Sequence, residues 1–314
     1  MWVMMEQIAP YAVAYTVPLL VTALGGLYSE RSGIVNIGLE GLMVTGAFAS
    51  ALTISLGKPL LEGGALWFGL LAGAAAGGLF ALLHAFASIS LKADQVISGT
   101  AINMLAGGLT LFLSRHVTGS GNIAVEGFTR FDVPGLCDLP MAGRLFFTET
   151  YATTWLVAGI WLVSYILLAK SVFGLRLRAC GEHPHAAAAA GIRVHRIRYT
   201  AVILSGILAG LGGSIMLETY AGEFNGSVFG MGFLALAALI FGQWKPWGIL
   251  GATLFFGFAS TMANVSQLTP VFQQIPGVVL KTFPYVMTLV VLVLFSRHSR
   301  APRAAGEPFD VSRQ

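Results

Sequence analysis

Long runs of apolar residues, separated by short polar segments, cover most of the chain. Most of these runs reach the roughly 17 to 25 residues that a helix needs to cross a bilayer. The pattern predicts an all-α, polytopic integral membrane protein, folded as one helical bundle over residues 1–314. We expect about nine spanning helices, with a range of eight to ten, at residues 10–27, 34–56, 65–91, 96–113, 152–169, 199–217, 229–241, 247–263 and 275–295.

The run at residues 229–241 is too short to cross the membrane alone. With residues 247–263 it flanks a polar Gln-Trp-Lys-Pro segment at 243–246. This pair can be tilted, re-entrant or extended, which leaves the span count uncertain by about one. Elsewhere, glycines recur at four-residue spacing and predict close helix packing; they are Gly69, Gly73 and Gly77, and Gly206 and Gly210.

Composition agrees with a membrane protein and excludes an ordinary soluble domain. The chain is 56% hydrophobic and 10% charged, whereas soluble domains carry about 25% charged residues. The net charge of +4 and the isoelectric point near 9.2 do not indicate nucleic acid binding, because the basic residues are confined to a few loops. The surface is expected to contact membrane lipid instead.

The distribution of basic residues predicts the orientation, since Lys and Arg are retained in cytoplasmic loops. If the loop at 170–199 is cytoplasmic, alternation places 13 of the 18 basic residues inside: Arg31, Lys92, Lys170, Arg176, Arg178, Arg193, Arg196, Arg198, Lys245, Arg297, Arg300, Arg303 and Arg313. The segment at 297–314 is then also cytoplasmic, and residues 116–150 lie outside. We therefore predict a multi-pass membrane protein with the loop at 170–199 and the segment at 297–314 on the cytoplasmic side.

Motifs for enzymatic chemistry, metals and cofactors are absent from the sequence. The histidines show no HExxH spacing, and the predicted topology puts Cys137 and Cys180 on opposite sides of the membrane. Gly57-Lys58 continues into Pro59 and lacks the upstream Gly and the Ser or Thr of a P-loop. We therefore assign no catalytic residue, metal or cofactor, and any ATP must be bound by another chain.

Glu40 is the most informative single residue, because it lies within the predicted span 34–56. A charge near the bilayer centre costs at least about 2.5 to 3.5 kcal/mol, so its carboxylate must face protein or water. Asn36 lies one helical turn earlier, and three glycines interrupt the stretch: Gly33, Gly38 and Gly41. Two interpretations stay open: Glu40 lines a transport path, or it lies near the cytoplasmic end and pairs with Arg31 or caps backbone groups.

Other polar residues in or near the spans also have two interpretations each. Ser98, Thr100 and Asn103 form a cluster in the fourth span, which either hydrogen-bonds neighbouring helices or contacts a solute. Four residues near the outer face favour a solvated loop over a functional site: Glu218, Tyr220, Glu223 and Asn225. Lys281 is expected to extend to the outer interface.

The loop at 170–199 contains a short helix that hydropathy does not require. Pro184 fits a first helical turn, residues 186–190 are all Ala, and Gly191 supplies a C-terminal stop. Such a helix is either an inert connector or a docking element held between two spans. The composition leaves these alternatives even.

Several motifs together resemble permease subunits of bacterial ABC importers, in the ribose-type branch and especially the group that moves nucleosides and related heterocycles. They are GLYSERSGIVNIGLEG at 26–41, DQVISGTAIN at 94–103, GLRLRACGE at 174–182, the segment 232–242 with its Trp-Lys-Pro extension, and RAPRAAGEPF at 300–309. The resemblance covers nearly the whole chain and implies the permease fold of type II ABC importers.

The resemblance also implies partners and site residues. The cytoplasmic loop would carry a coupling helix that docks on an ATPase subunit, with His185, Ala186, Ala187 and Gly191 at the motif positions and His185 in place of the usual Glu. A second permease chain, homologous or identical, would complete the pathway, and an extracytoplasmic solute-binding lipoprotein would deliver the solute. The segment 36–41 would approach the pathway, and the polar residues Asn36, Glu40, Ser98, Thr100 and Asn103 are its candidate lining.

The substrate implied by the resemblance is a purine or pyrimidine nucleoside, or riboflavin. Both join an aromatic heterocycle to a polyhydroxylated chain, which suits a pathway with a few polar groups among Phe and Tyr. Three alternatives remain: an ABC importer of a simple sugar, an ion-coupled secondary transporter, which would need no coupling helix, and a membrane scaffold, which would tolerate changes at Glu40 and Asn103.

Overall fold

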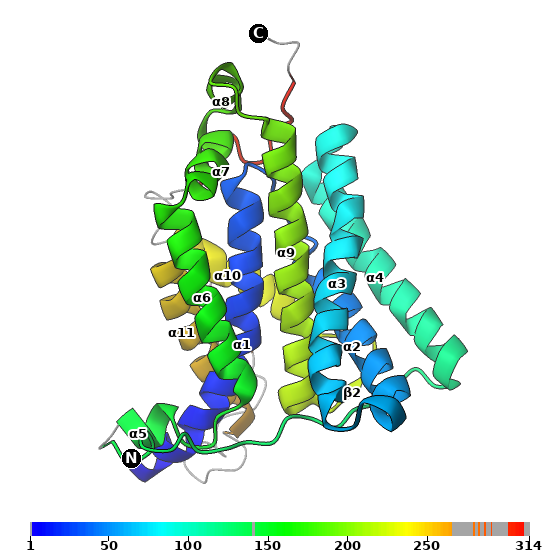
Figure 1. The fold of residues 1–314 in the computed structure, drawn as a ribbon, viewed down its shortest axis with the longest axis vertical. Helices are drawn as coiled ribbons and strands as arrows, with labels where there is room; N and C mark the ends of the chain where they lie inside the picture. The colour runs from blue at the N-terminus through cyan, green and yellow to red at the C-terminus, as the bar shows by residue number, and fades with distance from the viewer. Residues whose placement is uncertain are drawn as a thin grey trace.

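The computed structural model describes residues 2–139, 142–265 and 301–310, and the single positions Val279, Thr282, Val286 and Val290. These residues form a bundle of mostly antiparallel helices (Figure 1). The long helices are α1 (Trp2–Arg31), α2 (Leu39–Leu61), α3 (Ala65–Ala85), α4 (Gln95–Thr118), α6 (Ala152–Lys170), α9 (Val194–Met216) and α11 (Pro246–Val265). Three of them continue into short 3-10 or π segments: η1 (Glu62–Gly64), η2 (Phe86–Ser90) and η3 (Leu217–Ala221).

Shorter elements lie at the two ends and in the middle of the bundle. They are α5 (Ala142–Phe146), α7 (Val172–Glu182), α8 (Pro184–Ala189), α10 (Met231–Phe241), β1 (Ile123–Ala124) and β2 (Glu223–Phe224). The two strands form a small antiparallel ladder in which Ile123 lies opposite Phe224. In Figure 1, α7, α8 and residues 301–310 lie at one end, here called the α8 end, and α5 with the strand ladder lies at the opposite end, the strand end.

Six helical segments in the described residues are long and apolar enough to cross a membrane: Ile8–Arg31, Leu39–Lys58, Ala65–Ser90, Gln95–Thr118, Ala152–Lys170 and Val194–Ala221. They confirm the first six predicted spans. The count of about nine is not confirmed, since α10 has only 11 residues and the predicted span at 275–295, with Lys281, lies outside the described residues. The polytopic helical character is confirmed.

Those basic residues assigned to one side of the membrane that the structure describes lie at the α8 end. Arg31 lies 4.0 Å from Glu182 of α7, and Lys92 forms an ion pair with Asp310 at 2.8 Å. At the strand end, Lys58 pairs with Glu126 and Arg130 with Glu149. The grouping agrees with the charge pattern, whereas the assignment of the α8 end to the cytoplasm stays a prediction. Cys137 and Cys180 are both free; Cys180 belongs to α7 at the α8 end, and the Cys137 carbonyl lies against Gly143 of α5 at the strand end.

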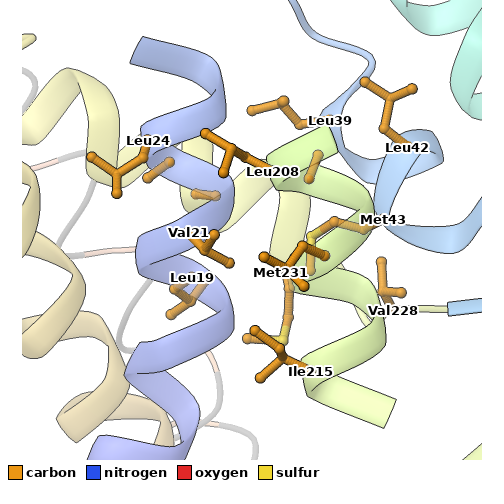
Figure 2. Close-up of a cluster of buried hydrophobic side chains, with 14 of the residues drawn as sticks. Leu19, Val21, Leu24, Leu39, Leu42, Met43, Leu208, Ile215, Val228 and Met231 are labelled. Carbon is orange, nitrogen blue, oxygen red and sulfur yellow. The ribbon is translucent and has the colours of Figure 1, made fainter. Parts of the chain in front are cut away.

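Helices α1 and α9 form the centre of the bundle. In their apolar windows 72% and 78% of the residues are buried, against 22% for α4 and α6. Figure 2 shows Leu19, Val21 and Leu24 of α1 together with Leu208 and Ile215 of α9 in one buried apolar cluster. The outer faces of α4 and α6 are left for lipid or for another chain.

Glycines bring α2, α3 and α9 into backbone contact, as the four-residue spacing predicts. A Cβ added to Gly46 would lie 2.2 Å from the Gly210 carbonyl oxygen, and one added to Gly77 would lie 2.3 Å from that of Gly206. A Cβ on Gly213 would lie 2.0 Å from the Met43 carbonyl. No side chain fits at these three positions, so the helix axes approach more closely than ordinary packing allows.

Candidate functional site

The second span begins later than predicted, and the difference places Glu40 at a helix start. Helix α1 ends at Arg31, the chain turns through residues 32–38 without helix, and α2 begins at Leu39. Gly33 has φ of +94°, a left-handed conformation that favours glycine. Residues 34–38 were included in the predicted span because they are mostly apolar, although the glycines around them indicated a broken or irregular helix. Their backbone is instead held by side chains of other helices, which hydropathy does not register.

The Glu40 carboxylate caps the start of the short helix α10. Its Oε1 accepts a hydrogen bond from the Gly230 amide at 2.9 Å, and its Oε2 accepts one from the Gly232 amide at 2.7 Å. A helix start has unsatisfied N–H groups and a partial positive charge, so a carboxylate there is stabilised. Because Glu40 also lies in the first turn of α2, two helix starts share its charge. Of the alternatives predicted for Glu40, backbone capping is found, with a partner 190 residues away.

Arg31 does not pair with Glu40. Its Nη2 donates to the Trp244 carbonyl at 2.8 Å, and its Nη1 lies 4.0 Å from the Glu182 carboxylate. The Trp244 indole in turn donates to Glu30 at 2.5 Å. Arg31 therefore ties the end of α1 to the turn between α10 and α11.

Two amide side chains hold the turn at residues 32–38 against its neighbours. Asn36 is fully buried; its Nδ2 donates to Ser205 Oγ of α9 at 2.9 Å and its Oδ1 accepts from the Gly38 amide. Asn103 of α4 donates to the Ile37 carbonyl at 3.0 Å and accepts from the Gly41 amide at 2.7 Å. The side-chain amides of both residues therefore bind groups of the protein itself, and Asn103 is also partly exposed.

Ser98 joins the same polar group, but Thr100 does not. The Ser98 hydroxyl lies 2.9 Å from Nδ1 of His84, whose Nε2 lies 3.1 Å from the Val35 carbonyl oxygen. The exposed Thr100 hydroxyl bonds to its own helix, 3.0 Å from the Val96 carbonyl. Interhelical bonding thus accounts for Ser98 and Asn103. Three residues of this group were not predicted from the sequence: His84, Gln95 and Ser205.

The polar junction, as we call Asn36, Glu40, His84, Ser98 and Asn103 with the turn they hold, is open on one side. Glu40 and Asn103 are partly exposed, and the large side chains Phe229 and Phe233 beside the capped helix start are 62% and 48% exposed. In the part of the chain that the structure describes, no group of three or more His, Cys, Asp or Glu side chains could hold a metal.

Near the strand end, the prediction of a solvated loop at residues 218–225 is wrong for Glu218. This residue is fully buried in the π segment η3, and its Oε1 accepts from Ser50 Oγ at 2.6 Å. Its Oε2 has no hydrogen-bond partner among the described residues. Tyr220 stacks on Tyr15 with ring centroids 4.2 Å apart, whereas Glu223 is exposed as predicted. The helix continues past the apolar run as a π segment, which the sequence pattern does not indicate.

The short helix in the loop at 170–199 is confirmed. Pro184 occupies its first turn, and Gly191 follows the helix with φ of +81°. Of the four residues assigned to docking by resemblance, His185, Ala186 and Gly191 are exposed, while Ala187 is only 4% exposed. Helix α8 therefore presents an open face and packs through Ala187.

Comparison with known proteins finds a family and relatives that match most of the chain. Residues 9–294 match a family described as the permease component of the branched-chain amino acid transport system. The guanosine ABC transporter permease protein NupQ of Bacillus subtilis (strain 168) is 47% identical, covering 96% of each chain. The nucleoside ABC transporter permease protein NupC of Lactococcus lactis subsp. cremoris (strain MG1363) is 40% identical, again over 96% of each. A putative glucose ABC transporter permease protein, TsgC13 of Haloferax volcanii, is 33% identical over 87% of each.

Proposed function

The chain belongs to the permease-component family of the branched-chain amino acid transport system, and from this premise we propose that it forms the membrane pathway for a nucleoside in an ATP-driven importer. It is a multi-pass protein of the bacterial inner membrane and a translocation subunit rather than an enzyme. Uptake then requires an ATPase subunit on the cytoplasmic side and a binding protein outside, and we propose that a second permease chain completes the pathway.

A nucleoside is favoured over an amino acid, a sugar or riboflavin by the relatives. The two relatives named for guanosine and nucleosides are 47% and 40% identical over nearly their whole lengths, and the relative named for glucose is 33% identical. The description of the family as a whole names amino acids, whereas the single proteins that match this chain directly are named for nucleosides or glucose. Identity of this extent over nearly the whole chain supports a shared solute class.

The open side of the polar junction suits such a solute. Phe229 and Phe233 offer aromatic surfaces for a base, and the partly exposed Glu40 carboxylate lies beside them, because it binds the amides of Gly230 and Gly232. Solute sites typically combine apolar and aromatic lining with a few placed polar groups. The observation that carries this proposal is the capping of α10 by Glu40, because it fixes Phe229 and Phe233 at the start of a half-length helix inside the bundle.

At the other site, we propose that the exposed face of α8 docks on the ATPase. Helix α8 connects α7 directly to α9, so a displacement of α8 is passed to a central span. The chain has no P-loop of its own. An ion-coupled secondary transporter would have no use for this exposed helix.

Reconstituted transport tests the proposal. The chain, its ATPase, a second permease and the binding protein are placed in vesicles, and uptake of labelled guanosine is measured with and without ATP. Ala187→Pro removes the hydrogen bond from the Ala187 amide to the His183 carbonyl and costs about 3 kcal/mol locally, so ATPase association and uptake should fail. Ala186→Ser, on the exposed face of the same helix, should retain both. Uptake driven by an ion gradient without the ATPase would contradict the proposal.

A further inference from the structure

Residues 301–310, here called the C-terminal segment, fold back onto the α8 end (Figure 1, red). The Ala304 amide donates to the Gly181 carbonyl of α7 at 2.9 Å, and the Gly306 amide donates to the Gly33 carbonyl at 3.1 Å. The Phe309 ring lies 5.1 Å from the His185 ring and 5.4 Å from the His195 ring, centroid to centroid. The C-terminal segment is therefore packed against α7, α8 and the start of α9.

Charged groups add to this attachment. The Arg198 side chain of α9, which is 1% exposed, donates to the Ser32 carbonyl at 3.2 Å and to the Glu307 carbonyl at 3.1 Å. Asp310 pairs with Lys92 at 2.8 Å. One buried guanidinium thus joins the C-terminal segment to the turn that leads to Glu40.

The inward side of the C-terminal segment supports α8 from below. Phe309 forms a small buried cluster with Cys180, Ala187 and Val194. This cluster explains why Ala187 faces inward. Burial also raises the pKa of the Cys180 thiol to about 11, although the Arg198 charge opposes the shift. The thiol is thus both covered and protonated at neutral pH, which makes it a poor target for labelling reagents.

The outward side of the C-terminal segment forms a hollow together with α8. The hollow encloses about 480 Å³. His183, His185 and Ala186 line one wall, and Arg303, Glu307 and Pro308 line the other. Arg303 and Glu307 line the hollow and are both exposed to solvent. The open surface of α8 thus continues without a break onto the C-terminal segment.

We propose that α8 and the C-terminal segment form one composite docking surface for the ATPase subunit, with Arg303 and Glu307 in direct contact with it. This inference rests on the proposed function. A six-residue helix is only about 9 Å long, whereas a stable interface buries about 800 Å² on each partner. The C-terminal segment supplies adjoining surface at the same end, with charges of both signs that can set the register of docking.

A charge reversal on the hollow tests the surface. Arg303→Glu should weaken ATPase binding by about tenfold or more, because a charge in the contact is replaced by its opposite. Arg176→Glu is the matched control, since Arg176 is exposed on α7 at the same end but does not line the hollow. Binding is measured by titrating purified ATPase into nanodiscs that contain the permease. Monodispersity and melting temperature show whether each variant is folded.

Site-directed cross-linking gives a second, independent test. A photo-crosslinker is attached to Glu307→Cys in a Cys137→Ser background, and Cys180 stays unlabelled because it is buried and its pKa is raised to about 11. We expect a cross-link to the ATPase from position 307 and none from Arg176→Cys. Because the substituted side chain is exposed, the fold should be retained.

The outcomes separate this inference from the proposed function. If Ala187→Pro abolishes ATPase binding but Arg303→Glu and the cross-linker at 307 behave like the Arg176 controls, α8 docks alone and the composite surface is wrong. If the wild-type chain does not bind the ATPase at all, the proposed function and the inference both fail. Weaker binding of Arg303→Glu together with a cross-link from position 307 supports the composite surface.

Discussion

Two carboxylates inside the bundle, the partly exposed Glu40 and the fully buried Glu218, are held in different ways. At the polar junction, both oxygens of Glu40 accept backbone N–H groups from the start of α10. Near the strand end, Glu218 has one donor, the hydroxyl of Ser50, and its other oxygen has no partner among the described residues. Only Glu40 is therefore fixed by the main chain.

The backbone around each residue accounts for the difference. A helix start has free N–H groups that need acceptors, and Glu40 supplies them to α10. A π segment changes the bonding of its carbonyl groups, and the carbonyls of Glu218 and Thr219 accept from Phe128 N at 2.7 Å and from Tyr151 Oη at 3.0 Å. The region around Glu218 is thus held by main-chain carbonyls. We infer that a charge inside a span is structural where it completes a helix end, and we expect it to be dispensable where the backbone groups are already satisfied, as at Glu218.

Glu40→Gln should have the largest effect. The glutamine side chain offers one carbonyl oxygen and directs its NH₂ group at a backbone N–H, so one donor at the start of α10 loses its acceptor. Hydrogen bonds to a charged group contribute about 1.5 to 3 kcal/mol, and we expect a loss of about 3 kcal/mol with loss of most nucleoside uptake. Thermal unfolding in detergent and vesicle uptake measure both. Glu223→Gln, at an exposed position, is the matched control and should have little effect on stability or uptake. If Glu40→Gln also has little effect, the comparison between Glu40 and Glu218 has no basis.

Gly232→Ala tests the contact between Glu40 and α10 from the α10 side and should have an intermediate effect. The added Cβ would lie 2.4 Å from both Cα and N of Glu40, so α2 and α10 must separate. Overpacking of this kind costs about 1 to 3 kcal/mol. The control is Gly159→Ala on α6, where no atom lies within 4 Å of the added Cβ. If both variants unfold at the wild-type temperature, the close contact between Glu40 and α10 is not required for stability.

Glu218→Gln should have the smallest effect. Its amide oxygen still accepts from Ser50, and its NH₂ group replaces the oxygen that has no partner, so the change should cost less than about 1 kcal/mol. Ser50→Ala in the wild-type background should cost more, because it leaves the buried carboxylate without its donor. A double-mutant cycle of the two changes measures their coupling. Loss of uptake in Glu218→Gln with normal folding would assign Glu218 a role in transport and reverse the comparison.

Local rules and hydropathy predicted much of the fold. Six spans follow from the length of their apolar runs, because the bilayer sets that length. Helix α8 follows from Pro184 and Gly191, whose backbone preferences act without distant partners. The need of Glu40 for a polar partner was also predicted from its position in an apolar run.

The identity of partners was beyond the sequence pattern. Glu40 finds its donors 190 residues along the chain, at a helix start that appears only as a short apolar run. His84 lies inside the longest predicted span, and nothing local indicates its contact with Val35. Glu218 was assigned to a loop because the apolar run ends at Leu217, whereas the π segment extends to Ala221. The C-terminal segment was noted only as a motif, because its packing depends on α7, α9 and the turn at residues 32–38 together.

The backbone contacts between α2, α3 and α9 have a mechanical consequence. Where glycine backbones touch, as at Gly46 with Gly210 and Gly77 with Gly206, no flexible side chain lies between the helices to absorb a shift. We therefore expect these three helices to turn as one rigid lever. This rigid unit extends from the start of α9, next to α8, to Glu40 at the start of α2. The pivot must lie at contacts made by side chains, and α6, of whose apolar window only 22% is buried, is a part that can yield while the lever turns.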